Sequence, residues 1–298
     1  MGGIRIPSPL DRIAIPGSST IYIKRDDLIH PLWGGNKWRK LKYHLAVYNA
    51  GNFSGMISYG GIHSNHLFAL GALCHEWDIP LIAYIRGHDP LPMTPTLDAL
   101  TRWGVQIKTT NTDEYRVQKR LVGIRDGWMI IPEGGTDELA LNGVGELAEE
   151  IMEQLPGTTH IMVPVGSGGT IAGLVMRLPE RVRIIGVVPM KAAAMREDLI
   201  GRFPRLAERS TWQLNHDYHF GGFGKYHPEI IRIMKLWVAQ YQAPLDPVYT
   251  AKMALALEDL VQGGFFPEDS RIVLIHTGGL QGIEGYLNAY RKQITLIS

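Results

Sequence analysis

The chain has 298 residues, of which 45% are hydrophobic, and this length predicts one large domain or two smaller ones. Its 30 Lys and Arg residues oppose 29 Asp and Glu residues, for a net charge of +1. A charge so close to zero excludes a whole-molecule field that would attract nucleic acid or an anionic membrane, so we expect neither as a partner.

Apolar runs alternate with helix-forming segments along most of the chain. We predict that a strand opens each of the segments 20–28, 56–60, 80–86, 105–110, 128–135, 159–176, 182–190 and 271–279. Helices are predicted at 37–49, 64–77, 94–104, 113–127, 144–155, 228–241 and 250–264. Strands that alternate with helices indicate βαβ crossovers, an α/β fold and a mainly parallel sheet. Such sheets bind ligands at the carboxyl ends of their strands.

The segment VPVGSGGTIAGL, residues 163–174, is the strongest signal for a ligand site. A strand leads into a glycine loop and then a helix, so backbone N–H groups and the helix N-terminus favour a bound phosphate. We expect a side chain at Gly168 to block the approach of the backbone to that phosphate and to demand a φ forbidden to other residues. The alternative is a tight turn without a ligand. The G-x-G-x-x-A in 142–148 lacks the preceding strand of a dinucleotide site.

Two further glycine turns begin helices that carry reactive side chains. In GGNKWRK, Lys37 stands at a helix start, where the helix dipole and burial lower a lysine pKa and suit Schiff-base chemistry. A solvated first-turn lysine is the alternative. In GGIHSNHL, Ser64 or Asn65 is also a good N-cap. His63 and His66 have no third ligand at a suitable spacing, so we expect no metal site.

The only cysteine, Cys74, lies in an apolar run and is expected to be a buried, inert thiol. A single cysteine excludes an intramolecular disulfide. The sequence has no apolar run of about 18 residues and no signal-peptide core at its start, so we expect a cytoplasmic protein.

The motifs IYIKRDDL, GGNKWRKL, GGIHSNH, VGSGGTIAGL, DPVYTAKM and HTGG follow one another from about Pro9 to Gly282. In their order and spacing the chain resembles the pyridoxal-phosphate enzymes of the tryptophan synthase β-like fold. Within that fold it is similar to the group of 1-aminocyclopropane-1-carboxylate deaminases and D-cysteine desulfhydrases. The resemblance implies pyridoxal 5′-phosphate as cofactor and a small amino acid as substrate.

The resemblance also implies roles for individual residues. Lys37 is expected to form the Schiff base with the cofactor, and Asn65 to contact the cofactor 3-hydroxyl. Ser64 would lie beside the substrate carboxylate, Tyr249 would stack near the cofactor and assist catalysis, and Thr277 would face the pyridine nitrogen. The phosphate contacts implied are Lys40, Gly166, Ser167, Gly168, Gly169 and Thr170. The substrate contacts implied are Ser64, Asn65, His66, Phe223 and Thr250.

The resemblance further implies the architecture. It predicts two open, mainly parallel twisted sheets with flanking helices and the cofactor between two domains. Residues 1–45 and 151–298 would form the large domain, and residues 46–150 the smaller inserted one. The assembly expected is a homodimer.

Two positions bear on the choice of reaction. The cyclopropane deaminases of the family carry glutamate and leucine where this chain has Thr250 and Thr277. Both threonines match the desulfhydrase pattern, which predicts β-elimination of D-cysteine to pyruvate, ammonia and sulfide. Phe223 replaces a family tyrosine, so a more apolar pocket is expected. The alternatives are ring-opening deamination of the cyclopropane substrate to 2-oxobutyrate and a non-catalytic cofactor-binding protein.

Overall fold

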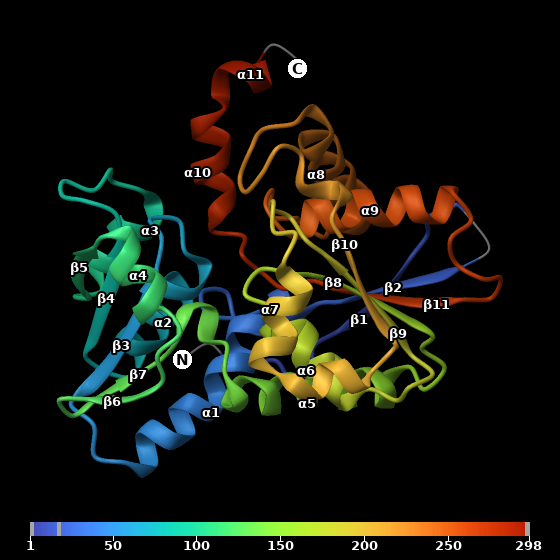
Figure 1. Ribbon diagram of the computed structural model, residues 1–298. Helices are drawn as coiled ribbons and strands as arrows, with labels where there is room; N and C mark the ends of the chain where they lie inside the picture. The colour runs from blue at the N-terminus through green and yellow to red at the C-terminus, as the bar shows by residue number, and fades with distance from the viewer. Residues whose placement is uncertain (1–2, 17–18, 296–298) are drawn as a thin grey trace.

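The computed structural model describes residues 3–16 and 19–295, and its strands form two sheets (Figure 1). The larger sheet has six strands, and all of its strand pairs are parallel except the edge pair β1–β2. In spatial order these strands are β1 (Leu10–Ile13), β2 (Thr20–Lys24), β11 (Arg271–Ile275), β8 (His160–Pro164), β9 (Arg183–Val187) and β10 (Trp212–Asn215).

The smaller sheet has five strands, and only its edge pair β6–β7 is antiparallel. In spatial order they are β5 (Gln106–Thr110), β4 (Leu81–Arg86), β3 (Gly55–Gly60), β7 (Trp128–Ile130) and β6 (Gly123–Arg125). The predicted α/β class with two mainly parallel sheets is therefore confirmed.

Helices cover both faces of the large sheet, α5 and α6 on one and α8 and α9 on the other (Figure 1). The helices of this half are α1 (Asn36–Ala50), α5 (Glu138–Gln154), α6 (Gly169–Arg177), α7 (Met195–Arg202), α8 (Pro228–Tyr241), α9 (Thr250–Gln262), α10 (Gly282–Ala289) and α11 (Arg291–Thr295). Those beside the small sheet are α2 (Asn65–Glu76), α3 (Pro95–Arg102) and α4 (Thr112–Gln118).

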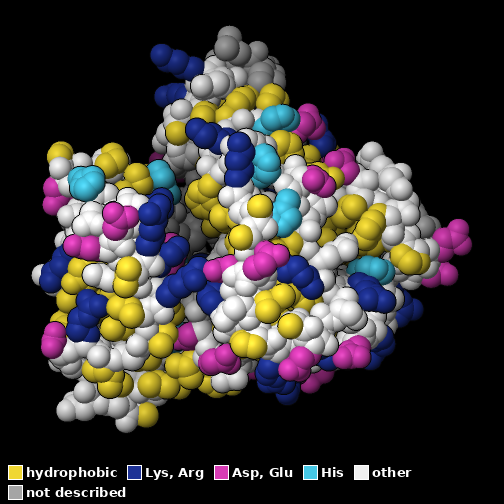
Figure 2. Space-filling view, viewed as in Figure 1, with side chains coloured by type: hydrophobic (Ala, Val, Ile, Leu, Met, Phe, Trp, Pro, Cys, Tyr) yellow, Lys and Arg dark blue, Asp and Glu magenta, His cyan; other side chains and the backbone are white. Residues whose placement is uncertain are grey.

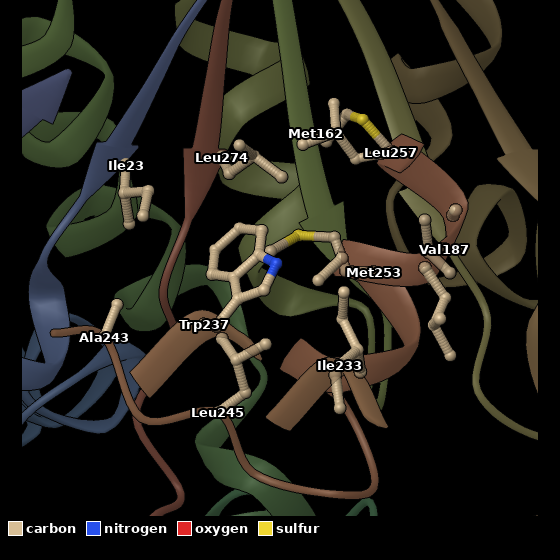
Figure 3. Close-up of a cluster of buried hydrophobic side chains, with 14 of the residues drawn as sticks. Ile23, Met162, Val187, Ile233, Trp237, Ala243, Leu245, Met253, Leu257 and Leu274 are labelled. Atoms are coloured by element: carbon tan, nitrogen blue, oxygen red, sulfur yellow. The ribbon is translucent and has the colours of Figure 1, made fainter. Parts of the chain in front are cut away.

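Strand β11 shows why these strands are continuously apolar. Ile272 and Leu274 point into the core beneath α8 and α9, whereas Val273 and Ile275 point into the core against α5 and α6. A parallel strand covered on both faces has no side for polar residues. Figure 3 shows Trp237 of α8 in the first of these cores, beside strand β11. The central strands are thereby held rigidly, and the loops at their carboxyl ends are held with them.

The helix predicted over 113–127 is wrong in its second half. Helix α4 ends at Gln118, and residues 123–125 instead pair with β7 as strand β6. The turn between these strands is Asp126-Gly127, whose φ angles are +49° and +81°. An Asp-Gly pair with two left-handed residues is the preferred two-residue hairpin turn, and it overrides the charged, helix-like pattern.

The domain boundary predicted at residue 150 falls inside α5. The apolar face of this helix, including Val144, Leu147 and Ile151, belongs to the core formed with β8 and α6 of the large sheet. The whole small sheet comes from residues 55–130. We therefore propose that the smaller unit ends before α5.

Candidate active site

A cavity of about 880 Å³ lies at the carboxyl ends of strands from both sheets. Its wall includes the segments that follow β2, β3, β8 and β11, as expected for a parallel α/β fold. The candidate residues that line it are Lys37, Lys40, Ser64, Asn65, His66, Gly166, Ser167, Gly168, Thr170, Phe223, Tyr249 and Thr277. Segments more than 200 residues apart in sequence thus meet in one site.

Lys37 lies in the first turn of α1, behind a turn that requires glycine. Gly35 has φ +70°, and a Cβ atom there would lie 2.2 Å from the carbonyl oxygen of Thr277. The turn before α1 therefore packs directly on the turn after β11. Burial lowers the pKa of Lys37 to about 8, although the nearby carboxylate of Asp246 opposes the shift. A substantial fraction of neutral amine is consequently present near neutral pH.

Lys40 stands one turn further along α1 and also lines the cavity. Its Nζ donates to the carbonyl oxygen of Gly134 at 3.2 Å, to Thr136 Oγ1 at 3.0 Å and to Ser167 Oγ at 3.1 Å. Burial first, then the charges of Lys37 and Arg202, hold its pKa well below the usual range. Among the described residues Lys40 has no ion-pair partner, so an anion bound here would supply its missing countercharge.

The glycine loop between β8 and α6 forms the adjoining wall. Gly168 caps α6 without a side chain, which leaves N–H groups of the first helical turn available to an anion. Asn36 Nδ2 donates to Thr170 Oγ1 at 3.0 Å, and Arg202 Nη2 donates to the carbonyl oxygen of Ser167 at 2.6 Å. The predicted phosphate loop therefore contacts two cations, Lys40 and Arg202.

The φ constraint expected at Gly168 is confirmed. Its φ is +85°, and a Cβ atom would lie 2.1 Å from Cδ2 of Leu199 on α7. The left-handed turn and the packing against α7 therefore both require glycine here, and the approach of its backbone to a phosphate stays a prediction. Gly169 also lies behind the cavity wall, where its Cβ position is 2.9 Å from Thr136.

The start of α2 lines the cavity from the small-sheet half. Ser64 caps the helix by accepting the N–H of Leu67 at 3.2 Å, and it also lines the cavity. His66 is buried, with Nε2 2.8 Å from Ser58 Oγ and with no partner for Nδ1. Burial and the charges of Lys37 and Lys40 hold the pKa of His66 far below its usual range, so it is neutral.

Tyr249 lines the cavity from the large-sheet half. Its ring packs on Gly166, where a Cβ atom would lie 3.0 Å from Cε1, and Phe223 contacts it edge-on with ring centroids 5.6 Å apart. Burial raises the Tyr249 pKa, which keeps the phenol protonated and able to donate. The Thr277 hydroxyl also lines the cavity and has no hydrogen-bond partner among the described residues.

Thr250 does not lie in the cavity wall, which contradicts its prediction as a substrate contact. It is completely buried, and its hydroxyl donates to Asp246 Oδ1 at 2.7 Å. Asp246 also accepts the N–H groups of Val248, Tyr249 and Thr250 at 2.8–3.0 Å. Burial raises the pKa of Asp246, although these hydrogen bonds oppose the shift. This carboxylate therefore fixes the turn that aims Tyr249.

Sequence reasoning missed five residues of the site: Asp246, Asn36, Thr136, Arg202 and Gln281. Only Asp246 carried a signal, as an Asp-Pro pair four residues before a predicted helix, where its carboxylate caps the helix start. Asn36 stands in the GGNKWRK motif beside Lys37, but nothing in that motif indicated a role for it. Thr136, Arg202 and Gln281 lie outside the quoted motifs and reach the cavity through the packing of distant segments.

Charged side chains follow the groove between the two halves (Figure 2). Arg120, after α4, pairs with Asp198 of α7 at 2.5 Å, and Asp198 also pairs with Arg202 at 3.3 Å. Lys119 pairs with Glu133 at 2.9 Å. The described residues contain no group of three His, Cys, Asp or Glu side chains placed to hold a metal ion. No helix among them is long and apolar enough to cross a membrane.

Comparisons with known proteins agree with this geometry. A family profile described as "Pyridoxal-phosphate dependent enzyme" matches residues 5–278. A "Putative 1-aminocyclopropane-1-carboxylate deaminase" of Pyrococcus abyssi is 30% identical, with 93% of this chain and 89% of that protein covered. A "D-cysteine desulfhydrase" of Salmonella schwarzengrund is 29% identical, with 95% and 94% covered. The crystal structure of an "ACC deaminase homologue" superposes with a TM-score of 0.81 at 27% identity, covering 99% of this chain and 95% of the other.

Proposed function

This chain belongs to the pyridoxal-phosphate dependent enzymes, with pyridoxal 5′-phosphate as its cofactor, and from that premise we propose that it acts as a D-cysteine desulfhydrase-like lyase. The reaction proposed is β-elimination on a small D-amino acid. With D-cysteine and water the products would be pyruvate, ammonia and sulfide.

The cavity residues suit this cofactor in charge and in hydrogen bonding. Lys40, the glycine loop and Arg202 would hold the phosphate, because they present two cations and open N–H groups. Lys37 would attach the cofactor covalently, since its lowered pKa supplies neutral amine. Asn65 and the unpartnered Nδ1 of buried His66 offer polar atoms in the remaining wall.

The bound cofactor supplies the electron sink for bond breaking at the substrate α-carbon. The chain's own groups then move the protons. The Lys37 amine, once released by the incoming amino group, would take the α-proton, and thiolate would leave from the β-carbon. Tyr249 is protonated and faces this region, so it can donate a hydrogen bond or a proton there. Free aminoacrylate would hydrolyse in water to pyruvate and ammonia.

The observation that carries elimination over ring opening is the uncommitted hydroxyl of Thr277 in the cavity wall. A hydroxyl at this position matches the desulfhydrase pattern, whereas the cyclopropane deaminases carry leucine there. As a neutral partner of the pyridine nitrogen, it suffices for the loss of an α-proton and a thiolate. Thr250 does not bear on the choice of reaction, because it is buried and its hydroxyl is hydrogen-bonded to Asp246.

Ring-opening deamination is the second candidate, favoured by the names of the relatives in Pyrococcus and of the superposed structure. It would convert the cyclopropane amino acid to 2-oxobutyrate and ammonia. The two reactions therefore differ in the keto acid they release.

A product assay tests the proposal. The purified holoenzyme is incubated with D-cysteine, L-cysteine, β-chloro-D-alanine, D-serine or the cyclopropane amino acid, and keto acids are separated by chromatography. Pyruvate from D-cysteine or β-chloro-D-alanine, with little 2-oxobutyrate, supports elimination. Mainly 2-oxobutyrate from the cyclopropane substrate would replace it with deamination, and bound cofactor without any product would identify a non-catalytic binder.

Assembly and location remain predictions. We propose a homodimer in the cytoplasm, with no nucleic-acid or membrane partner. Sedimentation of the purified holoenzyme at two concentrations tests the dimer, and a single monomeric species would contradict it.

A further inference from the structure

The side chain of Gln281 connects the two halves of the molecule inside the cavity. Gln281 lies in the turn between β11 and α10, and its Nε2 donates to Asn65 Oδ1 at 2.7 Å. Asn65 is the first residue of α2, on the other side of the cleft. Both residues line the cavity, so the bond spans the site itself.

This hydrogen bond determines which end of the Asn65 amide remains available to a ligand in the cavity. An amide has one accepting oxygen and one donating nitrogen. Gln281 occupies Oδ1, and among the described residues Asn65 Nδ2 donates no hydrogen bond. A Cβ atom at Gly279, whose φ is +87°, would lie 2.6 Å from Nδ2. The glycine turn after β11 therefore leaves the space that Nδ2 occupies.

We propose that Gln281 is a positioning residue, which holds Asn65 so that Nδ2 donates to the 3-oxygen of the cofactor. The inference rests on the contact proposed between Asn65 and that oxygen. A donor at this atom stabilises its anionic form and lowers the pH at which the attached cofactor loses its proton. Gln281 thus tunes the cofactor through Asn65 without touching it.

The alternative is that Gln281 merely ties the two halves together. Two substitutions separate these roles. Gln281→Met removes the hydrogen bond and keeps a similar length. Gln281→Glu keeps the shape but offers only acceptors, so Asn65 must turn its Nδ2 toward Glu and its oxygen toward the cofactor. A simple tie predicts the larger effect for methionine, because glutamate still accepts a hydrogen bond from the turned amide. Positioning predicts the larger effect for glutamate.

The measurements are the Kd of pyridoxal 5′-phosphate for the cofactor-free protein and the pH midpoint of the visible absorbance of the holoenzyme. We expect Gln281→Glu to weaken binding roughly tenfold, the scale of one hydrogen bond to a charged group, and to raise the midpoint by about one pH unit. Gln281→Met should change the Kd and the pH midpoint in the same direction, but by less. Neither readout uses turnover, so failure of the proposed reaction would leave this test intact.

Asn65→Ala provides the control for the added charge of glutamate. If Gln281 acts through Asn65, Gln281→Glu has no further effect in the Asn65→Ala background. A midpoint shift that persists there would overturn the proposal, because glutamate would then act directly on the cofactor. An effect of Gln281→Met as large as that of Gln281→Glu, or wild-type values for Asn65→Ala, would also overturn it. Circular dichroism and Tm of each variant confirm that folded proteins are compared.

Discussion

The pH dependence of cofactor attachment follows directly from the surroundings of Lys37. Its amine has a pKa of about 8 rather than the ordinary 10.5, because burial outweighs the attraction of Asp246. At pH 7 about one amine in ten is then neutral, compared with about one in three thousand for an ordinary lysine. Only the neutral amine attacks an aldehyde, so the structure predicts attachment about 300-fold faster than for an unperturbed lysine at that pH.

Stopped-flow mixing of cofactor-free protein with limiting pyridoxal 5′-phosphate measures this rate through visible absorbance. Between pH 7 and 10.5 the second-order rate constant should rise and then level off with a midpoint near 8. Asp246→Asn removes the charge that raises the Lys37 pKa, so its midpoint should fall below that of the wild type. A wild-type rate that still rises tenfold per unit above pH 9 would refute the reasoning.

Three further predictions concern individual contacts. Lys40→Met should raise the cofactor Kd at least tenfold by equilibrium dialysis, because its Nζ lies 3.1 Å from Ser167 Oγ at the anion end; an unchanged Kd would place the phosphate elsewhere. Gly168→Ala should lower Tm by several degrees, since φ is +85° and Leu199 blocks its Cβ; an unchanged Tm would contradict the packing argument. Thr250→Glu should also lower Tm and give no gain in ring opening, because it buries a second carboxylate beside Asp246; a stable variant that forms 2-oxobutyrate would restore Thr250 to the substrate site.

Sequence patterns predicted the parts of the fold that depend on local chemistry. Continuous apolar runs such as 272–275 indicate strands that are buried on both faces, and the structure has β11 there. Residues three apart share a helix face, which predicts that Lys37 and Lys40 lie on one side of α1, and both line the cavity. Glycine turns marked the ends of strands, where α/β folds bind ligands.

Other features depend on packing between distant segments. Thr250 follows the motif tyrosine directly, yet the helical turn after Asp246 directs it into the core while Tyr249 faces the cavity. The contact between Gln281 and Asn65 joins residues 216 apart in sequence, and no local sequence pattern predicts it. The hairpin at Asp126-Gly127 did have a local signal, but the charged run around it favoured a helix more strongly.

Mapping the covalent attachment site tests the central claim most directly. The holoenzyme is reduced with borohydride, digested, and analysed by mass spectrometry for the pyridoxyl-phosphate adduct. Four buried or cavity-lining lysines have lowered pKa values and compete as attachment sites: Lys24, Lys37, Lys40 and Lys252. Our account predicts the adduct on Lys37 and its loss in Lys37→Ala. An adduct on Lys40, on Lys252 or on any other lysine of the wild-type protein would contradict the account.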